Sequence, residues 1–88
     1  MSHDDLTGES RIAPVLLALA RQRGPSRSFC PSEAARRVAP HDWRELMPEV
    51  RRVAGDLCRG GALMATQQGA EVDPEMAKGP IRLRLRPV

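Results

Sequence analysis

Residues 29–61 read FCPSEAARRVAPHDWRELMPEVRRVAGDLCRGG, a pattern that predicts two helices separated by a turn. Pro31 suits the first helical position, where a missing N–H costs nothing. Glu33 falls at the third position, where a carboxylate can accept from the cap N–H. Cys30 occupies the cap position, although a thiol caps poorly. This first helix should end before Pro40. Its inward-facing residues are predicted to be Ala34, Ala35 and Val38.

The second helix of this segment should start at Asp42, because Glu45 follows it at the spacing of a second capping box. The helix should stop at Gly60 and Gly61. Between these limits the apolar residues recur at helical spacing and predict one buried side. They are Leu46, Val50, Val53, Ala54 and Leu57.

Pro48 complicates this second helix, because an internal proline removes a backbone hydrogen bond and costs about 3 kcal/mol. We therefore favour a short helical turn over residues 42–46 and a new helix that starts at Pro48. A single kinked helix is the alternative.

Before this segment, residues 1–9 are expected to be a disordered lead, and residues 10–88 the folded domain. Helical spacing predicts another helix, with Pro14 in its first turn and Gly24-Pro25 at its end. Its apolar residues are Ile12, Val15, Leu16, Leu19 and Ala20.

After Gly61, residues 62–67 and 81–86 are predicted to be strands. In the second strand Ile81, Leu83 and Leu85 alternate with arginines, which is typical of a half-buried strand. The intervening QGAEVDPEMAKGP should form a long loop, in which Asp73-Pro74 can start a single helical turn.

The order of these elements predicts a winged helix-turn-helix. The fold would be mostly α with a small β-hairpin, combining three helices with a two- to three-stranded antiparallel sheet. One core is expected, made of Ile12, Leu16, Leu19, Val38, Trp43, Val50, Leu57, Leu83 and Leu85.

Three segments, CPSEAARRVAP, HDWRELMPEVRRVA and VDPEMAKGPIRLRL, resemble a small bacterial domain-of-unknown-function family, number 3253 of its series. The resemblance extends from about Ile12 to Leu85. It implies a winged-helix-like fold. The family brings no established activity, so the resemblance assigns no functional residue.

At 88 residues the chain fits one domain. The net charge is +3, but the first ten residues hold three acidic residues, which leaves 14 basic and eight acidic residues in the rest. A basic balance favours an anionic partner such as nucleic acid. The arginine-rich composition is also what a GC-rich genome produces. No apolar run is long enough to span a membrane, and two cysteines make no disulfide framework, so a cytoplasmic protein is expected.

Apart from Arg11 and Arg27, the basic residues fall into two groups. Those at helix ends complement the helix dipole and need no ligand; they are Arg21, Arg23, Arg36, Arg37 and Arg59. The residues predicted to contact nucleic acid are Arg44, Arg51, Arg52, Lys78, Arg82, Arg84 and Arg86.

Arg52 points away from the apolar side of the helix that ends at Gly60, and Arg51 lies on its flank. In a winged helix this outward face can enter a major groove. The alternative is a solvated face in which Arg52 pairs with Glu49 and Asp56.

The row Arg82, Arg84 and Arg86 should project from one face of the last strand, about 6.8 Å between successive members. Such a row suits a phosphate backbone. The alternative is that these charges protect an exposed edge strand.

Other chemistries find little support. Trp43 and Phe29 are too few for a stacking platform for single strands and are expected to anchor the core. Cys30 at a helix start could be a reactive thiolate, but no local His–Asp arrangement supports catalysis, and Cys58 is expected in the core. A Cys30–Cys58–His41 metal site lacks the usual paired spacing. No enzyme activity and no cofactor are predicted.

The sequence therefore predicts a DNA-binding winged-helix module, such as an accessory transcriptional regulator that binds double-stranded DNA. The alternative is a protein–protein interaction module that reuses the same fold. A continuous positive face would favour DNA, whereas an exposed apolar patch would favour a protein partner.

Overall fold

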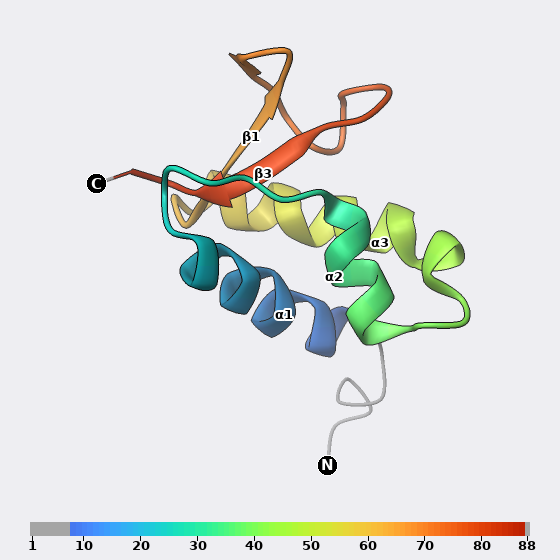
Figure 1. Cartoon of the computed structure of the whole chain (residues 1–88). Coiled ribbons are helices and arrows are strands. Elements are labelled where there is room, and N and C mark those ends of the chain that lie inside the picture. The colour runs from blue at the N-terminus through green and yellow to red at the C-terminus, as the bar shows by residue number, and fades with distance from the viewer. Residues whose placement is uncertain (1–7, 88) are drawn as a thin grey trace.

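The computed structural model describes residues 8–87, with side chains described from residue 11 onward. Three helices precede a small sheet (Figure 1). The elements are α1 (Gly8–Arg23), α2 (Pro31–Val38), α3 (Trp43–Arg59), β1 (Leu63–Gln67), β2 (Ala70–Glu71) and β3 (Arg82–Leu85). This is the predicted winged-helix-like layout.

The sheet is antiparallel, with strand order β2-β1-β3. Leu63 pairs with Leu85 and Thr66 with Arg82, so β3 lies along β1 as predicted. The two-residue strand β2 was not predicted, because two residues are too few to show an alternating pattern. It is joined to β1 by Gln68 and Gly69, which both have positive φ, as a tight hairpin turn requires.

One core joins the helices to the sheet. It is apolar throughout, and no charged or polar residue is buried among the described residues. Its largest members are Phe29, Ile12, Leu16, Leu19, Leu63, Ile81 and Leu83.

Phe29 ties the segment between α1 and α2 to the sheet. Its N–H donates to the Leu83 carbonyl at 2.7 Å, and the Leu83 N–H donates back to the Phe29 carbonyl at 2.8 Å. The Phe29 ring is fully buried. The outer edge of β3 is therefore covered at this point by the chain that leads into α2 (Figure 1).

The predicted ends of the helices are largely confirmed. The Cys30 N–H donates to Glu33 Oε2 at 3.0 Å, so Glu33 caps α2 as its spacing indicated. At the end of α3 the Ala62 N–H reaches the Leu57 carbonyl and Gly61 has a φ of 87°. This is the bond pattern of a Schellman motif, which glycine favours because it has no Cβ.

Two predictions about prolines were wrong. Pro14 lies inside α1 and not in its first turn, because the helix already begins at Gly8. Pro48 lies inside a continuous α3, so no new helix starts there and the single-helix alternative holds. In each case one backbone bond is lost, and burial of the helix's apolar side offsets that cost.

The start of α3 and the limits of the core also differ from expectation. Asp42 precedes α3, but its side chain makes no capping hydrogen bond. Trp43, Leu57 and Leu85 pack against the core and are only partly buried. The helical wheel gives the phase of these residues, but it does not say how far the neighbouring elements extend over them.

The predicted disordered lead, residues 1–9, lies only in part within the described residues. Its residues 1–7 lie outside the described part of the chain. Residues 8 and 9 belong to α1.

Candidate functional site

The outward face of α3 carries paired charges. Arg52 Nη2 lies 2.8 Å from Glu49 Oε2, and its Nη1 lies 3.5 Å from Asp56 Oδ2. These are the internal pairs that the sequence allowed as the alternative to groove contact. The carboxylates neutralise the surface that would otherwise meet phosphate groups.

Arg51 is used inside the molecule. Its guanidinium donates to the backbone carbonyls of Ala77 at 2.8 Å, Gly79 at 2.5 Å and, more weakly, Pro74 at 3.4 Å. It thereby fastens the loop between β2 and β3 against α3. Lys78 is exposed on that loop.

Arg59 also holds this loop, through the carboxylates of Asp73 and Glu75. Arg59 Nη2 pairs with Glu75 at 2.8 Å and with Asp56 at 2.6 Å, and its Nη1 lies 3.7 Å from Asp73. The hydrogen bond to Glu75, followed by that to Asp56, raises the pKa of Arg59 above its ordinary value. The end of α3 and the loop therefore form an acidic, internally paired surface.

Arg82, Arg84 and Arg86 do not all point to the same part of the molecule. Arg86 pairs with Glu71 at 2.6 Å and lines a hollow of about 280 Å³ beside Cys58. Burial raises the pKa of the Cys58 thiol. Arg82 and Arg84 turn instead to the segment between α1 and α2. The predicted single row of three is thus not formed, because β3 ends at Leu85 and Arg86 belongs to the chain beyond it.

Arg82 and Arg84 differ in how well they are satisfied. Arg82 donates to both the side-chain and the backbone oxygen of Ser28 at 3.0 Å. Arg84 makes only long contacts, to the Pro25 carbonyl at 3.4 Å and to the Met64 sulfur at 3.6 Å. Its Nε is buried without a partner. Arg84 therefore retains hydrogen-bonding capacity that the protein leaves unused.

Glu33 belongs to α2, and its side chain reaches the end of α1. Arg23 Nη2 lies 2.7 Å from Glu33 Oε1. This hydrogen bond is the largest cause that lowers the pKa of Glu33; burial acts in the opposite direction, and the Cys30 N–H and Arg82 lower the pKa further. Arg23 was predicted to complement the helix dipole. Its pair with Glu33 was not predicted, because no local sequence pattern links residues ten positions apart across a turn.

Two further arginines share one aromatic ring. The Arg36 Cζ lies 4.3 Å and the Arg44 Cζ 4.5 Å from the centroid of Trp43. Arg44 was predicted to contact nucleic acid, whereas Arg36 was assigned to the helix dipole. No sequence signal pairs Arg36 with Trp43, because they belong to different helices.

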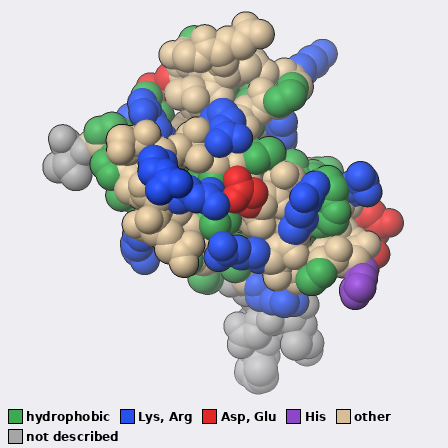
Figure 2. Space-filling model, in the orientation of Figure 1, with side chains coloured by type: hydrophobic (Ala, Val, Ile, Leu, Met, Phe, Trp, Pro, Cys, Tyr) green, Lys and Arg blue, Asp and Glu red, His purple; other side chains and the backbone are tan. Residues whose placement is uncertain are grey.

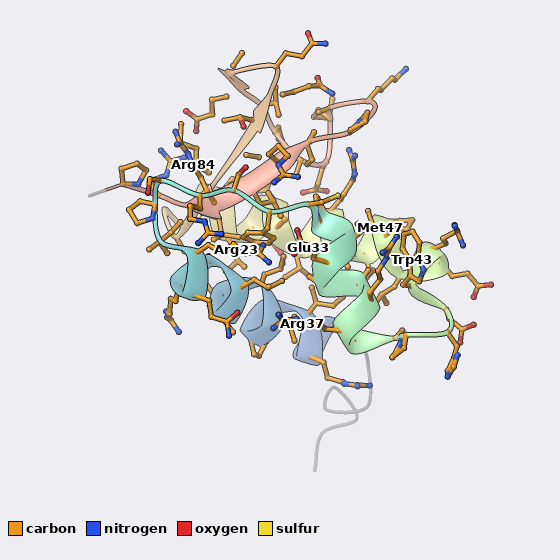
Figure 3. All side chains as sticks on the ribbon, viewed as in Figure 1. Arg23, Glu33, Arg37, Trp43, Met47 and Arg84 are labelled. Atoms are coloured by element: carbon orange, nitrogen blue, oxygen red, sulfur yellow. The ribbon has the colours of Figure 1, made fainter. Side chains whose placement is uncertain are left out.

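Five arginines from α1, α2 and β3 define what we call the basic face: Arg23, Arg36, Arg37, Arg82 and Arg84. Figure 2 shows Lys and Arg side chains spread over the side formed by α1, α2 and β3, with an acidic group among them. Figure 3 places the labelled Glu33 between Arg23 on α1 and α2, with Arg37 and Arg84 on the same side. Arg37 is exposed and forms no ion pair within the described part of the chain. Of the residues predicted to contact nucleic acid, only Arg82 and Arg84 belong to this face, and Arg44 lies next to it on Trp43.

Metal ligation finds no geometric support within residues 8–87, where no three His, Cys, Asp or Glu side chains are grouped to hold an ion. Cys30 and Cys58 are free thiols. None of the helices that the structure describes has the length and apolar character needed to cross a membrane.

The three helices and the small three-stranded sheet define a winged-helix-like domain. Residues 9–86 match the family described as protein of unknown function (DUF3253), and the chain belongs to that family. The match extends over nearly all of the described residues. No curated protein matches the chain.

Proposed function

We propose that this domain binds the phosphate backbone of double-stranded DNA through the basic face. The observation that carries the proposal is the gathering of arginines from α1, α2 and β3 on one side (Figure 2), with Glu33 among them (Figure 3). Glu49, Asp56 and Glu71 instead pair with Arg52, Arg59 and Arg86, respectively, elsewhere on the molecule. A surface divided in this way presents a positive field to one partner.

DNA contact would then involve the basic face and not the outward face of α3. Arg52 is paired with carboxylates and Arg51 is bonded to the loop, so neither is presented as a reader of base edges. Phosphate contacts position a protein and carry no sequence information. We therefore infer a module with low sequence preference, as an accessory part of a regulatory assembly in the cytoplasm, with a binding role and no catalytic one.

The test is fluorescence anisotropy with a labelled duplex across a salt series. With about five phosphate contacts, log affinity should fall against log salt with a slope of roughly −4 to −5. Arg37→Ala should reduce the steepness of that slope by about one unit on every sequence.

Arg52→Ala is the matched control, because it removes the same charge from the paired face of α3 and should change binding little. A selective loss with Arg52→Ala at a preferred site would restore α3 as the reading helix. Glu33→Gln should act in the opposite direction to Arg37→Ala and strengthen binding. Failure of the folded wild-type protein to bind at micromolar concentration in low salt would end the DNA proposal.

A second candidate function, docking of a protein segment, rests on Met76. Its side chain is 76 % exposed, and no other large hydrophobic residue in the described range is so exposed. A neighbouring groove of about 400 Å³ is lined by Met47, Pro48, Ala77 and two charged residues. One exposed methionine is less than the contiguous patch that marks most protein interfaces. DNA binding is therefore preferred.

A further inference from the structure

Trp43 holds two guanidinium groups that come from different helices. Arg36 belongs to α2, and Arg44 follows Trp43 in α3. Their Cζ atoms lie 4.3 and 4.5 Å from the centroid of the indole. Both distances fall well within the range of a cation–π contact, for which tryptophan is the best aromatic partner.

Neither guanidinium is neutralised. Both arginines are exposed, and within the described residues neither donates a hydrogen bond or forms an ion pair. Asp42 and Glu45 line a small hollow with Trp43 and Arg44, yet neither carboxylate pairs with these arginines. Two like charges are thus held beside one ring, and their N–H groups remain available for an anion.

We infer that Arg36 of the basic face forms a phosphate clamp together with Trp43 and Arg44. This inference rests on the proposed DNA binding. A guanidinium stacked on a ring keeps its edge free, and that edge matches a phosphate group in bidentate geometry. The ring fixes both side chains in advance, which lowers the entropy cost of binding. Trp43 is a positioning residue here, whereas the two arginines contact the DNA backbone.

The sharpest variant is the double substitution Arg36→Lys with Arg44→Lys. It keeps every charge and replaces the planar group, so it separates stacking and geometry from simple electrostatics. In the duplex anisotropy assay we expect affinity to fall about fivefold or more while the salt slope stays unchanged. Trp43→Leu should reproduce this effect, with circular dichroism confirming that the helices persist.

A second readout uses the fact that Trp43 is the single tryptophan in the chain. Titration with unlabelled duplex should change its emission, with a shift to shorter wavelength as water is excluded. The change should saturate at the affinity found by anisotropy. The Lys double variant should show a weaker shift at the same duplex concentration.

The outcomes separate the two proposals. Wild-type DNA binding with a normal salt slope, unaltered affinity in the Lys double variant and constant tryptophan emission would overturn the clamp and leave the basic face standing. Absence of any binding by the wild type would overturn both. Lower affinity at constant slope, together with the emission shift, supports the clamp.

Discussion

Glu33 performs two roles at the level of single residues. It accepts the Cys30 N–H at the start of α2 and pairs with Arg23 at the end of α1. Both partners donate to the charged carboxylate, which is why they lower the pKa of Glu33 while burial acts against them. The same side chain also places a negative charge inside the basic face. Glu33 therefore joins the two helices while it reduces the positive charge of the basic face.

This shift predicts how stability depends on pH. Since the pKa of Glu33 is lower in the folded state, its contribution is present above the ordinary carboxyl pKa of about 4.3 and is lost as pH falls through the folded value. The side chain is 36 % exposed, so we expect less than about 1 kcal/mol. Urea unfolding of wild type and Glu33→Gln should differ at pH 7, and the difference should be smaller at about pH 3. An equal difference at both pH values would contradict the assignment.

The loop between β2 and β3 shows how an element is placed. It contains one helical turn, in which the Asp73 carbonyl accepts from the Met76 and Ala77 N–H groups, as Asp73-Pro74 predicted. The sequence did not indicate that Arg51 and Arg59 would fasten this loop to α3. Arg51 was predicted to contact nucleic acid and Arg59 to complement the helix dipole, yet both hold the loop of the wing.

Arg51→Ala should therefore loosen the loop while leaving DNA affinity nearly unchanged. Hydrogen bonds from a charged donor to buried or partly buried carbonyls contribute about 1.5–3 kcal/mol, and we expect a loss of about 2 kcal/mol. Hydrogen exchange should accelerate at the amides of residues 72–80 and stay constant in α1. Arg21→Ala, which removes an exposed charge at the end of α1, is the control. A large loss of DNA affinity with Arg51→Ala would return Arg51 to the binding surface.

The whole molecule depends on one core that every helix and two of the strands share. Ile12 and Leu16 come from α1, Val50 and Val53 from α3, and Leu83 from β3. Phe29 joins these parts, because its ring is buried among them and its backbone pairs with β3. No subset of helices keeps a complete core when the sheet is removed.

Unfolding should accordingly be one cooperative transition. Trp43 fluorescence, which reports on the α2–α3 contact, and far-ultraviolet circular dichroism should give the same urea midpoint. Phe29→Ala should lower both midpoints together, because it should reduce the free energy of unfolding by about 3–5 kcal/mol. Leu57→Ala, at a half-buried position, should cost clearly less. Separate midpoints for the two probes would show that the domain has more than one folding unit.

The order of the three helices and of strands β1 and β3, the Glu33 cap and the glycine end of α3 were predictable from the sequence. Each depends on residues within a few positions of one another, and such local interactions leave a local pattern. Basic composition also predicted an anionic partner, which remains a prediction.

The tertiary structure decided which arginines remain available for a partner. Arg51 was assigned to the nucleic-acid face because a helical wheel does not contain the loop that returns to α3. For Arg52 the wheel left two alternatives open, and the structure shows the pairing with Glu49 and Asp56. Arg23 and Arg36 were predicted only to complement helix dipoles. In the folded structure Arg23 pairs with Glu33, and Arg36 lies over the ring of Trp43. The contacts of Arg51, Arg23 and Arg36 join residues of different elements, whereas the Arg52–Glu49 pair is local to α3. Their formation depends on how the whole core packs, because short-range periodicity constrains only which side of an element is buried.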